Sequence, residues 1–211
     1  MQDFNNDLDR RSFLRRATFT LAGVAALHVG AGGCANNSRA VALSDAPVNS
    51  PNSTDWKITL VSHDEPGLPL IVSGTIYAHD GKTPLEGVRL YVYHTDARGI
   101  YSEQPNSGGL PNARLKGWML TDKQGRYEFR TIKPASYPGL ASPPAHIHSS
   151  ASGAGYRERW IDNFLFADDS RLDRETRARY GVGNSFASVM EIKRSDDGVL
   201  RCVRDIRLER T

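Results

Sequence analysis

The chain has 211 residues, of which 39% are hydrophobic, and its 27 basic and 24 acidic side chains give a formal net charge of +3. This length predicts one domain with tails, and the scattered charges argue against a nucleic-acid partner. The only cysteines are Cys34 and Cys202, which excludes a disulfide framework and a cysteine-based zinc site. A bound metal would therefore need histidine, tyrosine or carboxylate ligands, and Cys202 is most simply a small core residue.

The first 33 residues have the pattern of an export signal. A basic segment at residues 10–16 precedes an apolar, glycine-rich stretch at residues 17–33, which is shorter and more interrupted than the about 20 apolar residues of a membrane span. The pattern resembles a twin-arginine signal peptide, which implies export of the folded protein to the periplasm or the cell exterior. Cys34 lies where a lipoprotein would be cleaved, so lipidation of Cys34 and simple cleavage both stay open. We expect no other contact with a membrane.

The rest of the chain divides into a linker and one domain. Residues 34–55 are rich in Asn, Ser and Pro and predict a flexible linker. In residues 56–211, short apolar or alternating runs recur between turn signals. Three of these signals, Asp80-Gly81, Gln124-Gly125 and Asp197-Gly198, are of the kind that closes β-hairpins. The predicted strands are residues 56–61, 70–78, 88–94, 127–132, 145–149, 160–166, 187–192 and 202–208.

One short helix is predicted at residues 172–180, in the C-terminal third of the domain. Ser170 is the expected N-cap, and Gly181 is expected to end the helix. Many strands at close spacing with a single helix predict an all-β fold, an antiparallel β-sandwich.

Two histidines in one predicted strand are the first functional signal. His146 and His148 are separated by one residue, and because strand side chains alternate between faces, both imidazoles should point to the same side. Alone, such a pair is more often an ordinary half-exposed pair than a metal site. The motif around it changes that interpretation.

The segment from residue 65 to residue 166 resembles the intradiol ring-cleavage dioxygenase family. The resemblance rests on Phe129-Arg-Thr-Ile-Lys-Pro, which is followed by Tyr137-Pro and then by Pro144-Ala-His146-Ile-His148. It implies a non-haem Fe(III) site with four protein ligands, which are Tyr101, Tyr137, His146 and His148. A phenol with an ordinary pKa of about 10 needs a strong Lewis acid to displace its proton, and a trivalent hard cation is suited to that.

The same resemblance implies the reaction and its partners. A catechol-type substrate would react with O2, and the ring would open between its two hydroxylated carbons to give a cis,cis-muconate-type diacid. Tyr137 would be the ligand that leaves and accepts a substrate proton. Two phenolates, two neutral imidazoles and a hydroxide balance the charge of Fe(III), so a buried site carries no net charge. Flavin, haem and nicotinamide are not expected.

Several residues depart from the family pattern. Pro143 stands where the family usually has an Arg that steadies charge on the substrate ring, and Arg130 or Arg114 could replace it as a substrate contact. Asn163 keeps an amide where the family has a Gln, so it is a candidate for contacting substrate or O2, against a simple strand hydrogen bond. Gly139 replaces an aromatic residue, which predicts a more open pocket. The substituents on the substrate ring therefore cannot be predicted from the sequence.

These departures keep two alternatives open. The domain could be a β-sandwich that binds metal or catechol with weak or no turnover, or His146 and His148 could bind copper, which phenolates suit less well than iron. The oligomeric state also stays open. The remaining aromatic and histidine residues are interpreted as core, surface or structural residues: Tyr91, Tyr93, Tyr127, His63, His79 and His94.

Overall fold

The computed structural model describes residues 52–102 and 112–210 of the chain. The predicted export signal, and nearly all of the predicted linker, therefore lie outside the described residues. Within the described part, no helix is long and apolar enough to cross a membrane.

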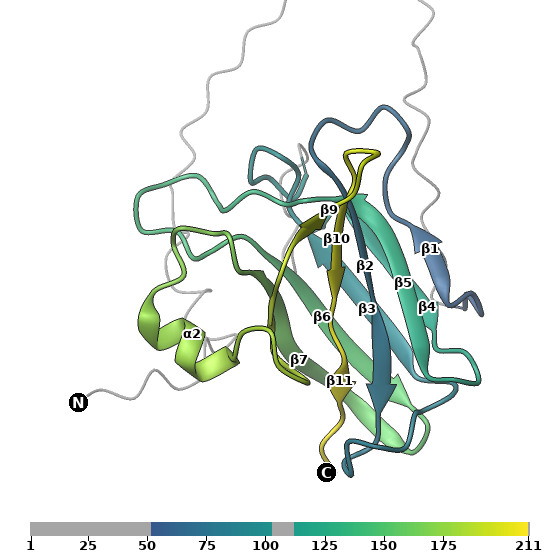
Figure 1. The fold of residues 1–211 in the computed structure, drawn as a ribbon. Helices are drawn as coiled ribbons and strands as arrows, with labels where there is room; N and C mark the ends of the chain where they lie inside the picture. Colours follow the sequence, from purple (N-terminus) through teal and green to yellow (C-terminus); the bar gives the residue numbers. More distant parts are fainter. Residues whose placement is uncertain (1–51, 103–111, 211) are drawn as a thin grey trace, which may run out of the picture. The chain divides into compact units, whose positions relative to one another are not determined.

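The strands form two sheets that can be followed in Figure 1. The six-stranded sheet has the order β1 (Lys57–Thr59), β5 (Arg126–Ile132), β2 (Pro69–Tyr77), β10 (Leu200–Val203) and β9 (Lys193–Arg194), and β11 (Ile206–Arg207) also pairs with β2. The five-stranded sheet has the order β4 (Leu115–Leu120), β3 (Arg89–His94), β6 (His146–Gly153), β7 (Tyr156–Phe166) and β8 (Val189–Met190).

Side-chain alternation explains how the two sheets share one core. In β5, Tyr127, Phe129 and Thr131 are buried, whereas the charged residues between them lie on the other face. Buried apolar side chains of both sheets form a single cluster, with Phe129 from one sheet and Phe164 from the other among its largest members. Burial of each such ring contributes about 1.5–3 kcal/mol to stability.

Two buried polar side chains in this core tie separate strands together through hydrogen bonds. His94 on β3 contacts the Thr131 hydroxyl on β5 through Nε2 at 2.7 Å, so this bond joins the two sheets. The Tyr127 hydroxyl donates to the carbonyl of Arg204 at 2.6 Å. Both contacts avoid the cost of an unpaired polar group in an apolar interior. Cys202 is also buried, as the sequence predicts.

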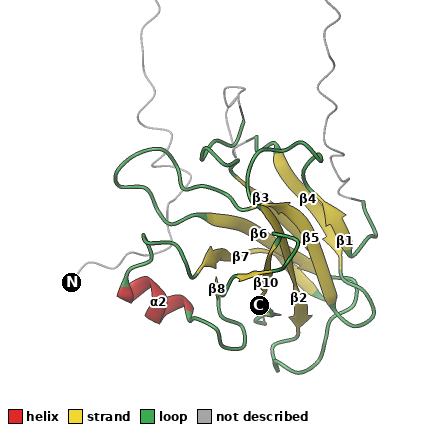
Figure 2. Ribbon diagram, turned by 45° about the horizontal axis from the view of Figure 1, so that its top comes forward, coloured by secondary structure: helices red, strands yellow, loops and turns green. Residues whose placement is uncertain are grey.

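The predicted all-β sandwich with one short helix is confirmed, with some differences in detail. The helix α2 (Arg174–Tyr180) lies beside β7 and β8 (Figure 2), and Gly181 follows its last residue. Its N-cap is Asp173 rather than Ser170, because the Asp173 carboxylate accepts a bond from the backbone N–H of Thr176 at 2.7 Å. The sheets also contain parallel pairs, namely β1–β5, β2–β10, β2–β11 and β7–β8.

Candidate metal centre

The strand β6 carries both histidines of the predicted site. Ile147, which lies between them, is fully buried in the core, so His146 and His148 project from the opposite, outer face of the five-stranded sheet. The Nδ1–H of His146 donates to the carbonyl oxygen of Pro144 at 2.7 Å. This bond fixes the tautomer of His146 and leaves the lone pair of its Nε2 facing the site.

Neighbouring residues hold β6 and its histidines in place. The Asp169 carboxylate accepts a bond from the backbone N–H of Ala145 at 2.7 Å, just before His146. On β7, the pairing shifts between Ile147 and Ser149, so that two residues, Asp162 and Asn163, lie opposite His148 alone. This β-bulge brings the Asn163 side chain into a hydrogen bond with the His148 ring.

The two tyrosines come from two loops that are bonded to each other. The Thr95 hydroxyl donates to the carbonyl of Ala135 at 2.7 Å, and the backbone N–H of Ala135 donates to the carbonyl of Asp96 at 3.1 Å. Gly99, at φ +82°, packs so closely on Ser136 that a Cβ would lie 2.1 Å from the Ser136 carbonyl oxygen. These contacts bring together the loop that carries Tyr101 and the loop that carries Tyr137.

Four polar atoms therefore converge at one point, and we call Tyr101, Tyr137, His146 and His148 the donor cluster. The Tyr137 hydroxyl lies 2.5 Å from the Tyr101 hydroxyl, 3.1 Å from Nε2 of His146 and 3.3 Å from Nε2 of His148. Nε2 of His148 lies 3.0 Å from Nε2 of His146 and 2.9 Å from the Tyr101 hydroxyl. The structure thus brings together all four residues that the sequence analysis placed in one metal site.

These separations are compatible with a single metal ion. Two ligands that are each about 2.1 Å from one ion, and about a right angle apart, lie about 3 Å from one another. Within the described residues, no group of three or more His, Cys, Asp or Glu side chains could hold a metal, so a metal site there depends on the phenols. Phenolate and imidazole ligands together suit a trivalent iron better than a hard divalent cation.

Burial sets the protonation of the donor cluster. It lowers the pKa of His146, and it lowers the pKa of His148 to about 4, helped by the nearby charge of His146. Both imidazoles are therefore neutral at neutral pH, as metal ligands must be. Burial also raises the pKa of Tyr101 and of Tyr137, and the bond to Tyr137 raises that of Tyr101 further. Both phenols keep their protons until a cation displaces them.

The structure does not bring the arginines named from the sequence to the donor cluster. Arg130 lies on β5 in the six-stranded sheet, where its mostly exposed guanidinium is 3.8 Å from Glu128. Arg114 makes two bonds to the Glu65 carboxylate, at 2.6 and 2.7 Å. Pro143 is exposed. Asn163 does reach the site, and its hydrogen bond to the His148 ring makes it a positioning residue for that ring.

Tyr93 is a site residue that the sequence analysis placed only in the core. Its ring stacks on the His148 ring, with centroids 4.6 Å apart and planes at 17°, and its centroid lies 5.7 Å from that of Tyr101. The contact arises because Tyr93 and His148 pair directly across β3 and β6 on the outer face. A sequence with an alternating Tyr-x-Tyr strand hints at such a face, but the pairing register decides which ring meets the histidine.

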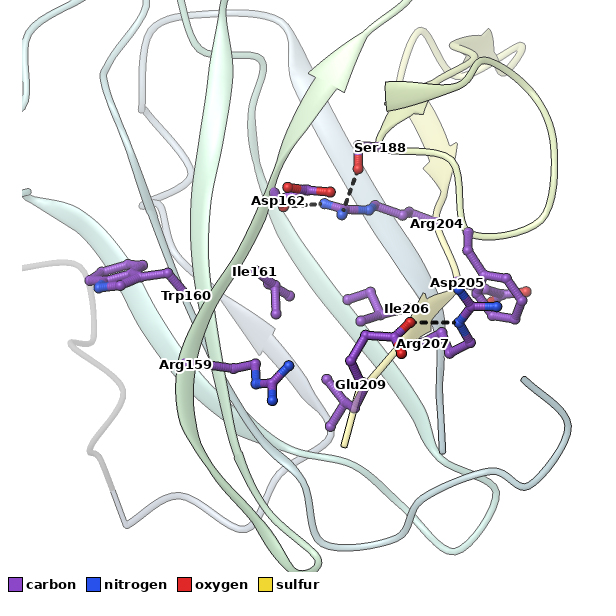
Figure 3. A pocket seen from close by; sticks show the side chains of 12 residues that line it. Arg159, Trp160, Ile161, Asp162, Ser188, Arg204, Asp205, Ile206, Arg207 and Glu209 are labelled. Atoms are coloured by element: carbon purple, nitrogen blue, oxygen red, sulfur yellow. Dashed lines mark hydrogen bonds and ion pairs between the residues drawn. The ribbon is translucent and has the colours of Figure 1, made fainter. Parts of the chain in front are cut away.

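A cavity of about 290 Å³ lies elsewhere, at the edge where β7 approaches the C-terminal segment (Figure 3). Buried Arg204 crosses this edge and donates to the Asp162 carbonyl at 2.8 Å and to the Ser188 hydroxyl at 3.0 Å. Its guanidinium also lies 4.4 Å from the Phe164 ring centroid. Arg204 therefore links β7 with the segment before β8, and among the described residues the donor cluster does not line this cavity.

Fold and site together define an all-β sandwich with a two-tyrosine, two-histidine cluster on the outer face of one sheet. The family model described as Dioxygenase matches residues 47–198, most of the chain, so the chain belongs to this dioxygenase family. This confirms the family predicted from the resemblance to intradiol ring-cleavage dioxygenases.

Three similar proteins illustrate the relationship. Catechol 1,2-dioxygenase 1 of Acinetobacter lwoffii is 35% identical over 113 residues, which are 46% of this chain and 36% of that protein. The protocatechuate 3,4-dioxygenase beta chain of Burkholderia cepacia is 32% identical over 130 residues, which are 58% of this chain and 55% of that protein. This chain thus spans only about a third to about a half of these relatives.

The third similarity is structural. The dioxygenase domain of a dioxygenase carbohydrate-binding protein fusion from Streptomyces sp. SirexAA-E has a TM-score of 0.55 at 24% identity. The match covers 79% of this chain and 96% of that domain. It shows a shared fold.

Proposed function

We propose that this chain is a non-haem Fe(III) dioxygenase that cleaves a catechol-type ring between its two hydroxylated carbons and forms a cis,cis-muconate-type diacid. One observation carries the proposal: the Tyr137 hydroxyl lies 2.5–3.3 Å from the other three polar atoms of the donor cluster, and Nε2 of His148 lies 2.9–3.0 Å from the Tyr101 hydroxyl and from Nε2 of His146. The names of the relatives, catechol 1,2-dioxygenase and protocatechuate 3,4-dioxygenase, support the substrate class and the use of O2.

The donor cluster would hold the ferric ion through two phenolates and two neutral imidazoles. When bound there, the ion would supply the Lewis acidity that lowers the pKa of a catechol and makes the catecholate reactive toward O2. The protein contributes the neutral state of both histidines, because burial lowers the pKa of His146 and His148. It also orients them through the Pro144 carbonyl and the Asn163 side chain.

Tyr137 is the proton acceptor in this proposal. Its hydroxyl lies within 3.3 Å of the other three donor atoms, and its side chain is half-buried. The residues that follow it, 138–141, are largely exposed, whereas the loop before Tyr101 is held by Asp96, whose carboxylate accepts bonds from two backbone N–H groups at 2.8 and 3.0 Å. Tyr137 can therefore move more easily, leave the cluster and take a catechol proton at its hydroxyl oxygen.

The test begins with the purified, iron-loaded protein. We expect visible absorption from ferric tyrosinate, oxygen uptake with catechol, protocatechuate or hydroxyquinol, and a diacid product that contains both atoms of O2. A colourless protein that binds no iron and consumes no O2 with any of the three would contradict the proposal. Elemental analysis of protein folded in the cytoplasm also distinguishes iron from copper.

A second candidate function is a β-sandwich that binds metal or catechol without efficient turnover. It is favoured by the positions of the arginines, because the Arg114 side chain is paired with Glu65 and Arg130 lies on the other sheet. Neither therefore takes the place of the arginine that the family usually has where this chain has Pro143. A catechol that shifts the visible spectrum without oxygen uptake would support this candidate. Turnover at several catechol molecules per iron each second would eliminate it.

The cellular location is part of the proposal. Residues 1–33 direct export by the twin-arginine route, and the mature protein begins at or near Cys34. Fractionation of cells that produce the full chain, together with mass spectrometry of the mature N-terminus, distinguishes a lipidated Cys34 from simple cleavage. Replacement of Arg10 and Arg11 by lysine should leave the protein in the cytoplasm, and normal export of that variant would contradict the route.

A further inference from the structure

Trp160 presents a large aromatic surface to solvent next to the donor cluster. The residue is 52% exposed, although it lies in the middle of β7. It pairs with Ser150 of β6, and Ile161, the next residue, packs against the core. Trp160 is therefore on the outer face that also carries His146 and His148, and in Figure 3 its indole points away from the cavity at the sheet edge.

A single ring separates Trp160 from the donor cluster. Tyr93, which is 6% exposed, meets the Trp160 ring edge-on, with centroids 6.0 Å apart and planes at 75°. The same Tyr93 ring stacks on His148 and lies beside Tyr101. A series of ring contacts thus runs from two of the four donors through buried Tyr93 to the exposed indole.

The chemistry around Trp160 indicates what would cover it. An exposed indole leaves apolar surface in contact with water, which is unfavourable. It binds best to a planar, apolar group in a stacked or edge-on arrangement. Glu158, two residues earlier on the same face of β7, accepts a bond from the Ser150 hydroxyl at 3.2 Å. Its carboxylate disfavours an anionic group at this position, so the occupant should carry no negative charge.

We propose that the exposed indole of Trp160, supported by the buried ring of Tyr93, forms a subsite for a second aromatic ring, and that the substrate is a catechol carrying an aryl substituent without a negative charge. The inference rests on the proposed function, because the first ring is placed by the donor cluster. The aryl group covers the exposed indole of Trp160. Trp160 is then a specificity-determining residue that distinguishes two-ring from one-ring catechols.

The test compares two substrates in the iron-loaded protein, catechol and 4-phenylcatechol. Trp160→Ala should lower the ratio of kcat/KM for 4-phenylcatechol to kcat/KM for catechol by about tenfold, mostly through KM, because the lost ring contact and burial act only on the aryl group. Trp160→Phe should retain most of the ratio. The matched control is Trp56→Ala, since Trp56 lies against the six-stranded sheet beneath Lys57 and Arg126. It should leave both substrates unchanged.

The outcomes separate the subsite from the reaction. An unchanged ratio in Trp160→Ala, or equal losses on both substrates, overturns the subsite while leaving the dioxygenase proposal intact. If the protein shows no oxygen uptake at all, calorimetric titration of the iron-free protein with the same two catechols tests the subsite by itself. Tighter binding of 4-phenylcatechol that is lost in Trp160→Ala supports the subsite, and equal binding of both catechols overturns it.

Discussion

Gly99 lies against the Ser136 carbonyl so closely that the two loops carrying the phenols of the donor cluster cannot approach in the same way with any other residue at position 99. A Cβ there would lie 2.1 Å from the carbonyl oxygen and 3.2 Å from Pro138, next to Tyr137. The convergence of Tyr101 and Tyr137 thus depends on the absence of a side chain two residues before Tyr101.

We expect Gly99→Ala to separate the two tyrosines. The substitution adds backbone strain at φ +82° and a clash with a carbonyl, which together cost about 2–4 kcal/mol. The variant should bind iron more weakly and lose visible absorption at a given iron concentration. Gly155→Ala is the matched control, because its φ of +86° is similar but its Cβ would meet nothing within 4 Å. Equal effects of the two substitutions would contradict the role assigned to Gly99.

Removal of either phenol should affect the metal directly. Tyr101→Phe and Tyr137→Phe each delete one of the four donor atoms, so the affinity for iron should fall by more than about 100-fold, the upper range for loss of an outer-shell partner. Iron titration followed by visible absorption measures this. Tyr180→Phe removes a hydroxyl from α2 and should have no effect. If both donor variants keep wild-type colour and affinity, the tyrosines are not ligands.

Loss of the Asn163 hydrogen bond should loosen His148. Asn163→Leu keeps the approximate volume but cannot bond the ring, so we expect iron affinity to fall by about 10- to 100-fold. Asn163→Gln keeps an amide and should recover part of the loss. The measurement is competition for iron with a chelator, which requires no turnover. An Asn163→Leu protein with unchanged iron affinity would leave Asn163 as a simple strand residue.

The buried histidine His94 should make the metal-free protein less stable in mild acid. Burial lowers the pKa of His94 to about 4 from its usual 6.5. Between these two values the unfolded chain binds a proton that the folded protein does not, so the free energy of unfolding falls as the pH falls. His94 alone should account for about 3 kcal/mol between pH 6.5 and pH 4.

Urea unfolding at pH 7 and at pH 4.5 measures this dependence. His94→Gln should be less stable than the wild type at pH 7, because it loses the bonds to Thr131 and Thr95, but its stability should fall less on acidification. Exposed His63, replaced in the same way, provides the control. A wild-type stability that does not change between the two pH values would show that His94 is not held neutral by burial.

The sequence was informative where function depends on a local pattern. The alternation around Ile147 predicts that His146 and His148 share a face, and the structure places both on the outer face of β6. The turn at Asp197-Gly198 joins the antiparallel pair β9 and β10, as predicted, and Gly198 there has a positive φ. Both features are set within a few residues of chain.

Features set by pairing between distant strands were not predicted. The strand β4 (Leu115–Leu120) was missed, because Lys116 and Gly117 disfavour a strand, and its pairing with β3 overrides that preference. The Gln124-Gly125 turn predicts a hairpin, but it joins β4 of one sheet to β5 of the other, because the sequence does not show which sheet each strand enters. The sequence also does not show that β5 lies in the sheet away from the donor cluster, so it does not exclude Arg130 as a substrate contact.

The contacts of Asn163 and Tyr93 with His148 also depend on pairing between distant strands. One arises from an extra residue in β7 and the other from the register between β3 and β6. Neither the bulge nor the register can be inferred from a single sequence, since both result from competition between whole strands.

The donor cluster is divided between two kinds of support. Its two nitrogen donors belong to the central strand β6, which pairs with β3 on one side and β7 on the other, whereas its two oxygen donors lie on two connecting segments. Substitutions in those segments can therefore alter the positions of the two phenols, or the access to the donor cluster, while the two sheets stay folded. A family built this way can diversify its chemistry in the loops and inherit its stability from the sheet.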